Sequence, residues 1–441
     1  MIFIVELFFE LLLIYKVWNE EDRTNLFIWF MTACIMLFPQ FKIGVGIPDC
    51  SWMFPIVGLA RFAFKDKNLI ETWKAFPLKY IYAVLLIFHF VQPIFVSFQP
   101  LGLTYFYVIQ YTMKTYLYVF LGFCIAPNYN ELKEKKQWIL ACIITLFVIA
   151  VISRLTSNNF ISSSLNSNSI WTAVREGSER GFRVTGPVAS PNAFGFINVL
   201  MVLFIYEIEE KIYVKFLLIL AVLCNLVFCA TRAPLMGFFA VSGIYLLSVS
   251  KVKLVRIIVL SSMSFILIFN IIGSNKAFNN YVNNFTDLIL TGGENTKGSS
   301  ADLRLGQLEV SLDYAEDNPI WGNGNMYASY LMSNRNNAAY DNELYGAEGY
   351  LFFILIDYGY IYLGIVLVYF CYLLYLFYKY RLRNTRGGML GIASTTGLLT
   401  FLLTSRPDNS WQVFMPVIGA CLYMLINEDE NTNRYKGLII K

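Results

Sequence analysis

The sequence predicts an all-α protein that crosses a membrane many times, and composition, apolar runs and the placement of basic residues all lead to this class. Of its 441 residues, 57% are hydrophobic and 15% are charged, and the mean hydropathy is +0.55. Soluble domains carry about 25% charged residues. This chain therefore lacks the polar surface that would cover it in water.

Apolar runs long enough to cross a bilayer recur along the chain. About 30 Å of hydrocarbon requires roughly 20 apolar residues, or fewer in a short helix, and this criterion predicts about 12–13 transmembrane helices. The first run is a weak candidate because Glu6 and Glu10 interrupt it, and the third is short. The runs are 1–18, 24–40, 51–64, 78–98, 102–126, 137–154, 192–208, 213–230, 233–250, 254–273, 359–379, 387–404 and 411–426.

Lysines and arginines cluster on alternate loops between these runs, and the positive-inside rule assigns such loops to the cytoplasm. The intervening loops, which include 155–191 and 274–358, then lie outside, and the C-terminus is cytoplasmic. The basic clusters are Lys65, Lys67 and Lys74; Lys133, Lys135 and Lys136; Lys211 and Lys215; Lys251, Lys253 and Arg256; and Lys379, Arg381, Arg383 and Arg386.

Charge and cysteine usage exclude several classes of function. The net charge of +4 is small and spread over many loops, so nucleic-acid binding is not expected. The eight cysteines lie almost entirely in apolar runs and form no CxxC pair, which indicates buried filler and predicts neither a metal site nor a disulfide framework. The first run lacks a basic start and a small-residue cleavage site, so we interpret it as a membrane segment.

Two outside loops are candidates for a functional site. Residues 155–191 are rich in Ser and Asn and then carry mixed charges, and residues 274–348 are far longer than a simple connection needs. The middle of the longer loop predicts an amphipathic helix over Ala301 to Asp317, which Asn318 and Pro319 would end. An ordered element outside the membrane suggests a site there.

The sole histidine, His89, lies within an apolar run. A polar residue at membrane depth is a functional candidate. However, a neutral imidazole is also satisfied by one interhelical hydrogen bond, and its apolar neighbours favour this structural role. Because no outside loop contains a histidine, a base acting there would have to be a carboxylate.

Arginines recur in the outside loops, where the positive-inside rule disfavours them. Arg232 is the sharpest case, because it lies in a tight turn between two apolar runs with Pro234 in the next helical turn. A fixed guanidinium fork matches two phosphate oxygens, whereas snorkelling to lipid headgroups is the alternative. The outside arginines are Arg183, Arg232, Arg304, Arg335 and Arg406.

Glu348 lies where the long loop re-enters the membrane, immediately before an apolar run that extends to Asp357 and Gly359. A partly desolvated carboxylate at this place is a candidate general base. The alternative is a first-turn acid that stabilises the helix dipole, and one residue can do both.

Four motifs resemble the O-antigen ligase and polymerase family. Arg183 to Asn192 is similar to that family's R-x-x-G…P-N element, and Thr231-Arg232 partly matches its T-x-S-R turn. Arg304 with Asn318–Gly324 resembles the R…P-x-x-G-x-G element, and Glu348 to Gly359 resembles the re-entry motif, although the family's second glycine is replaced by Tyr362. The resemblance covers about residues 180–370, in the family's order.

The residue at position 348 separates two branches of this family. Ligases that transfer finished O-antigen to lipid A carry a histidine eleven residues before the first glycine of the re-entry motif, and counting back from Gly359 places Glu348 there. A glutamate resembles the polymerase branch. The resemblance therefore favours an O-antigen polymerase of the bacterial inner membrane, with its site facing the periplasm.

The resemblance implies a GT-C-like, metal-independent glycosyltransferase without a cofactor. Its donor and acceptor would be undecaprenyl-diphosphate-linked glycans, its surroundings membrane lipids, and a chain-length regulator protein a further partner. The catalytic residues implied are Glu348, Arg232 and Arg304, and the substrate-binding residues are Arg183, Asn192, Arg335, Arg406, Tyr345 and Tyr350. The outside aromatic residues Trp171, Tyr314, Trp321, Tyr327, Tyr340 and Tyr345 are candidates for stacking on sugars.

We expect three parts: N-terminal transmembrane helices over 1–154, a ligase/polymerase-like core over 155–379 that includes the loop 274–348, and C-terminal helices over 380–441. Three alternatives stay open. An O-antigen ligase shares the fold and donor, but the missing outside histidine speaks against it. A lipid-linked oligosaccharide flippase would show internal symmetry and a charged pathway at the midplane, and a scaffold would give the outside arginines no purpose.

Overall fold

The computed structural model describes residues 2–37, 53–96, 116–127, 129–161, 182–188, 190–209, 211–246, 301–333, 344, 349–381, 386–404 and 413–426. Within these ranges every regular element is a helix and there is no strand. The chain is an all-α polytopic membrane protein, as its composition predicts.

Five helices of the described part are long and apolar enough to cross a membrane. A sixth span is formed if α4 and α5 are taken together, although they meet at an angle of 108°. The five are α8 (Gln137–Thr156), α10 (Pro191–Ile208), α11 (Ile212–Cys229), α17 (Tyr350–Arg381) and α18 (Arg386–Thr404), and the bent pair is α4 (Leu69–Ala75) and α5 (Lys79–Phe95).

The remaining predicted runs also contain helix, apart from 254–273, which lies outside the described residues. The helix predicted over Ala301 to Asp317 is present with those bounds. These elements are α1 (Ile2–Asn19), α2 (Arg23–Thr32) with the π-helix Ala33–Leu37, α3 (Met53–Ala60) with the π-helix Arg61–Lys65, a helix at 116–124, α7 (Tyr129–Glu134), α12 (Arg232–Leu246), α15 (Ala301–Asp317), α16 (Tyr327–Ser333) and Val413–Ile426.

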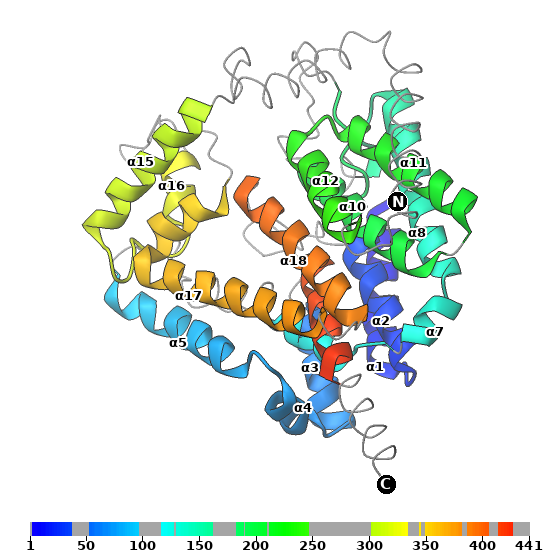
Figure 1. Cartoon of the computed structure of the whole chain (residues 1–441), viewed down its shortest axis with the longest axis horizontal. Coiled ribbons are helices and arrows are strands. Elements are labelled where there is room, and N and C mark those ends of the chain that lie inside the picture. The colour runs from blue at the N-terminus through cyan, green and yellow to red at the C-terminus, as the bar shows by residue number, and fades with distance from the viewer. Residues whose placement is uncertain are drawn as a thin grey trace.

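Helix α10 is the centre of the bundle. In its membrane-spanning stretch 89% of the residues are buried, compared with 33% in the membrane-spanning stretch of α8. It is apolar all round, which is typical of a helix enclosed by others, and it packs against α8, α11, α12 and α18. Figure 1 shows α10, α11 and α12 together on one side, and α17 running alongside α5 beneath α15 and α16.

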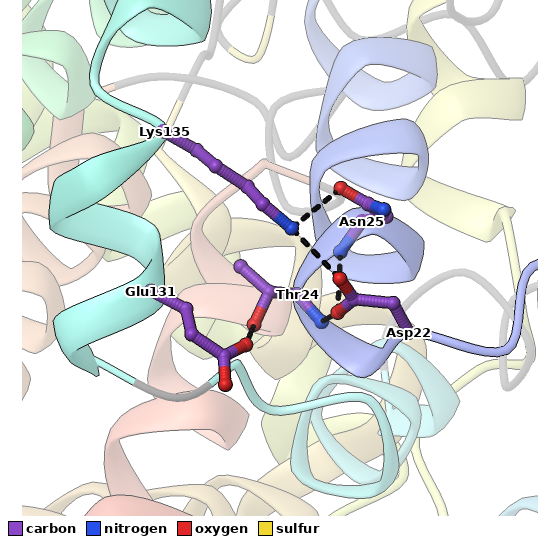
Figure 2. A network of polar contacts seen from close by, with 5 residues as sticks. All are labelled: Asp22, Thr24, Asn25, Glu131 and Lys135. Carbon is purple, nitrogen blue, oxygen red and sulfur yellow. Dashed lines mark hydrogen bonds and ion pairs between the residues drawn. The ribbon is translucent and has the colours of Figure 1, made fainter.

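Polar contacts join the start of α2 to α7 and to Lys135, which directly follows α7 (Figure 2). The Nζ atom of Lys135 lies 2.8 Å from an Asp22 carboxylate oxygen and 2.7 Å from Asn25 Oδ1, and the Thr24 hydroxyl donates to Glu131 at 2.6 Å. Lys135 belongs to a loop that the positive-inside rule places in the cytoplasm. The contacts therefore place the start of α2 beside this loop, and that this side is the cytoplasm stays a prediction.

Candidate functional site

The first turns of α10 and α12 pack together and form one wall of the candidate site. A Cβ atom added to Gly195 would lie 2.4 Å from the Pro234 ring, so only glycine allows this approach. Ser190 caps α10 by accepting a hydrogen bond from Ala193 N, and Pro191 fits the first helical position. Asn192 therefore lies in the first turn of α10, half-buried, beside the end of α12 that begins at Arg232.

Arg183 is held at the C-terminal end of α11. The residue whose carbonyl it binds, Cys229, lies three positions before Arg232. The Nε atom of Arg183 donates to Cys229 O at 3.3 Å, and Val184 N donates to Phe228 O at 3.0 Å. The guanidinium of Arg232 is half-buried, with its Nη1 atom shielded from solvent. Two of the predicted phosphate-binding arginines therefore come from segments that are in direct contact.

Asn159 organises the Arg183 segment and was not predicted. Its side-chain amide donates to Arg183 O at 3.0 Å, and its Oδ1 accepts from Thr185 N at 3.0 Å. One asparagine side chain thus pairs the carbonyl of Arg183 and the N–H of Thr185, in a segment that forms no helix or strand. The left-handed Gly186, φ +60°, then turns the chain against Phe194 of α10.

Helix α18 runs antiparallel to α12 and ends beside its start. Phe196 of α10 contacts the Gly237 position of α12 and stacks edge-on with Phe401 at 4.5 Å, whereas Val241 lies against Gly397. A step of four residues forward along α12, from Gly237 to Val241, therefore matches a step of four residues backward along α18, from Phe401 to Gly397. The C-terminal end of α18 and the N-terminal ends of α10 and α12 therefore lie at the same end of the bundle.

Helix α17 begins next to the end of α18. A Cβ atom on Gly349 would lie 3.3 Å from Leu403 O, and Tyr350 is buried in the main core with 3% exposure. Glu348 directly precedes Gly349 in the sequence, and it lies outside the described residues together with Tyr345, Arg335 and Arg406. Tyr350 itself packs as a core residue.

Helix α17 contains the apolar run predicted over 359–379 and also extends before it. It begins at Tyr350 and breaks at Gly359, which has φ 73° and ψ −171°. The loop 318–326, which follows α15, docks into this break. Tyr360 N donates to Pro319 O at 2.9 Å, and Gly324 N donates to Asp357 O at 3.0 Å. Two of the four family-like motifs are therefore in direct contact.

Asp357 caps α16 from a different helix, and its role was not predicted. The carboxylate is buried, and its two oxygens accept hydrogen bonds from Met326 N at 3.0 Å and Ala328 N at 2.7 Å. These N–H groups belong to the start of α16, where a negative charge is favourable. Asp357 therefore orders the chain that follows the loop.

The contacts of Asn323 fix how α15 lies against the first part of α17. Its Nδ2 atom donates to Tyr314 O at 2.9 Å and to Ile356 O at 3.1 Å. Helix α15 ends at the docking loop, and the first part of α17 ends there too, at Gly359. Followed back from the loop toward their N-termini, the two helices therefore run in the same direction. At 1.5 Å per residue, Arg304 is about 15 Å before Tyr314 and Tyr350 is about 9 Å before Ile356. The side chain of Arg304 lies outside the described residues.

The structure shows the surroundings of Trp321 and His89, two residues singled out in the sequence. Trp321 stacks on Phe95 with ring centroids 4.5 Å apart, so at least one ring face is used in packing and is closed to a sugar. His89 is completely buried, and its Nε2 lies 2.9 Å from the Tyr362 hydroxyl. This interhelical bond is the kind that the structural interpretation of His89 expects.

The helix ends of α10, α12, α17 and α18 define the class of this protein. It is a polytopic membrane protein with arginine-bearing segments at one end of its helix bundle. Residues 216–367 match the family model described as O-antigen ligase. The match supports the O-antigen ligase/polymerase superfamily, whose members are glycosyltransferase-like enzymes, and it does not distinguish polymerase from ligase. It includes Arg232, Arg304 and Glu348 and excludes Arg183 and Asn192. No curated protein matches the chain significantly. Among the described residues there is no cluster of metal-ligating side chains.

Proposed function

We propose that this chain is an O-antigen polymerase, a glycosyltransferase that joins lipid-diphosphate-linked oligosaccharide units at the periplasmic face of the inner membrane. The observation that carries the proposal is the position of four helix ends at one end of the bundle: α10 begins against α12 near Arg232, and α17 begins against the end of α18. The ends of α17 and α18 lead directly to Glu348 and Arg406 in the sequence.

The arginines would stabilise the leaving diphosphate. When the bond between the donor sugar and phosphate breaks, negative charge develops on the phosphate oxygens. Guanidinium groups held where this charge develops stabilise the transition state more than the ground state. We assign this role to Arg232 and Arg304, with Arg183 in support. Asn192, Arg335, Arg406 and Tyr345 are proposed substrate contacts.

Glu348 would act as the general base. It would accept the proton of the acceptor hydroxyl as that oxygen attacks the anomeric carbon, and the bond to the lipid diphosphate would break in the same displacement. The new glycosidic bond leaves the lengthened glycan on the acceptor lipid and frees the donor's lipid diphosphate. No part of this step requires a metal or a cofactor.

The test uses a deletion strain complemented with variants. Glu348→Gln and Arg232→Ala should each reach the membrane at wild-type level while the lipid-linked glycan collapses to single repeat units. Glu309→Gln is a matched control, because Glu309 is an exposed carboxylate on α15, and it should leave long polymer. Normal polymer in the Glu348→Gln strain would remove Glu348 from the base role.

An O-antigen ligase is the second candidate, because the matching family model, whose description is O-antigen ligase, does not distinguish a ligase from a polymerase. A ligase would use the same donor and transfer the glycan to lipid A-core. The deletion strain separates the two, since loss of a polymerase leaves a single repeat unit on lipid A-core, whereas loss of a ligase leaves no O-antigen there at all.

A further inference from the structure

One amide group joins three segments of the chain at the break in α17. Gln92 of α5 is completely buried, and its Nε2 atom donates to Trp321 O at 2.6 Å and to Asp357 O at 2.7 Å. The first carbonyl belongs to the docking loop and the second to α17. Gln92 itself lies outside the family match, in the N-terminal part of the chain.

The break explains why an amide is needed there. In a continuous helix, Asp357 O would accept a hydrogen bond from the N–H four residues later. The positive φ of Gly359 diverts the chain, and Tyr360 N bonds to Pro319 O instead. The carbonyl of Asp357 is therefore paired by Gly324 N and Gln92, and an amide nitrogen has two hydrogens, one for each carbonyl it contacts.

The same face of α5 also makes the apolar contacts that hold the docking loop. Phe88 and Phe95 lie four residues before and three residues after Gln92, so they share one helix face with it. Both pack against Trp321, with ring centroids 5.4 Å and 4.5 Å away. The docking loop is thus held by an apolar clamp around a central pair of hydrogen bonds.

We propose that Gln92 is a positioning residue, which fixes α15, and Arg304 with it, relative to the start of α17 that follows Glu348. This inference rests on the proposed function for its catalytic consequence. The loop that Gln92 holds starts where α15 ends, 13 residues after Arg304, or about 20 Å along the helix. A tilt of about 3° at the loop moves Arg304 by about 1 Å, enough to weaken catalysis strongly.

The first measurement tests position directly and does not depend on catalysis. Spin labels would be placed at Leu305 of α15, which is exposed, and at Leu351 in the first part of α17, which is partly exposed, in the full-length protein in nanodiscs with Cys50, Cys224 and Cys371 changed to serine. The variant is Gln92→Met, which keeps the volume and removes both donors. We expect a narrow distance distribution in the parent protein and one that broadens or shifts by several ångströms in Gln92→Met.

The matched control is Tyr82→Phe. Tyr82 is also a buried residue of α5 that bonds to α17, with its hydroxyl 3.4 Å from that of Tyr369, but it does not contact the docking loop. Its distribution should equal that of the parent protein. An unchanged distribution in Gln92→Met overturns the proposal, and so does an equal broadening in Tyr82→Phe.

The second measurement is turnover of unlabelled protein with purified lipid-linked repeat units. A displaced Arg304 should lower kcat by about 10–100-fold and change KM much less, because the arginine acts on charge that develops in the transition state. Broadened distances with wild-type turnover would overturn the catalytic part of the proposal. If the wild-type protein itself transfers no sugar, the proposed function fails, and the distance measurement still decides the role of Gln92.

Discussion

Gly322 and Gly359 lie backbone against backbone, so that neither position accepts a side chain. A Cβ atom on Gly322 would lie 2.5 Å from the carbonyl of Asp357, and one on Gly359 would lie 2.9 Å from Gly322 N. Both residues also have positive φ, 68° and 73°. Two family-like motifs, one from the loop after α15 and one from the first part of α17, therefore fit together through their glycines.

Gly359→Ala should lower stability by about 1–3 kcal/mol, because its φ and ψ lie in a region that is open almost only to glycine. Thermal unfolding of the purified protein in detergent would measure the loss. Gly364→Ala is the control in the same helix, since a Cβ atom there meets nothing within 4 Å. Equal melting temperatures for the two variants would contradict the docking contact.

Asp357→Ala should loosen α16 without disturbing the membrane helices. The change removes both acceptors of Met326 N and Ala328 N, and unpaired buried N–H groups cost about 1–3 kcal/mol. Hydrogen exchange at these two amides should become faster while exchange in α10 stays slow. Asp313→Asn, an exposed carboxylate on α15, should leave the exchange of α16 unchanged. Unaltered exchange in Asp357→Ala would rule out this cap.

The fold could be predicted because its signals are local. Apolar runs of spanning length mark the helices, and the pattern between Ala301 and Asp317 marks α15, since each helix is encoded by consecutive residues. The break at Gly359 escaped this reasoning. It depends on the docking loop, about 40 residues earlier in the chain, which replaces the hydrogen bonds that the break removes.

The site could be predicted only in part, for the same physical reason. Arg183, Asn192 and Arg232 were predicted from their residue types and order; the structure places their segments together, and their role in a site stays a prediction. Asn159, Gln92 and Asp357 were missed as positioning residues. The two hydrogen bonds of Gln92 span 229 and 265 positions of the sequence, so no local pattern could reveal them.

His89→Leu should destabilise the protein and leave its chemistry intact. The change removes the 2.9 Å bond to Tyr362 in the buried aromatic cluster between α5 and α17, at a cost of about 1–3 kcal/mol. The melting temperature should fall, and cells with wild-type amounts of the variant should still make long polymer. Single repeat units at full protein level would instead indicate a catalytic role.

Asp22 and Lys135 should give stability that disappears in acid. The hydrogen bond from Lys135 and those from Asn25 N and Thr24 N lower the pKa of Asp22 below its usual 3.8. A lowered folded-state pKa stabilises the fold above the unfolded-state pKa and loses this effect as pH falls through the folded value. Asp22→Asn should therefore reduce the melting temperature at neutral pH, and the difference should shrink as the pH falls below 3.8 and vanish once the pH is below the lowered pKa of Asp22.

The size of this effect is limited because both side chains are about one-third exposed, and such pairs contribute at most about 1 kcal/mol. Lys135→Gln is the matched variant, and the double variant should lose little more than either single one. A difference between Asp22→Asn and wild type that persists unchanged in acid would show that the cap geometry, and not the charge, is responsible.

Arg304→Lys separates the charge of this side chain from its shape. Lysine keeps the positive charge and loses the planar fork that binds two phosphate oxygens together. If Arg304 stabilises the leaving diphosphate, kcat should fall by about 100-fold or more, as on removal of one oxyanion donor, with membrane levels and the melting temperature unchanged. A lysine variant with full turnover would show that only a general positive field is needed, and Arg304 would then have no reason to be held by the docking loop and α17.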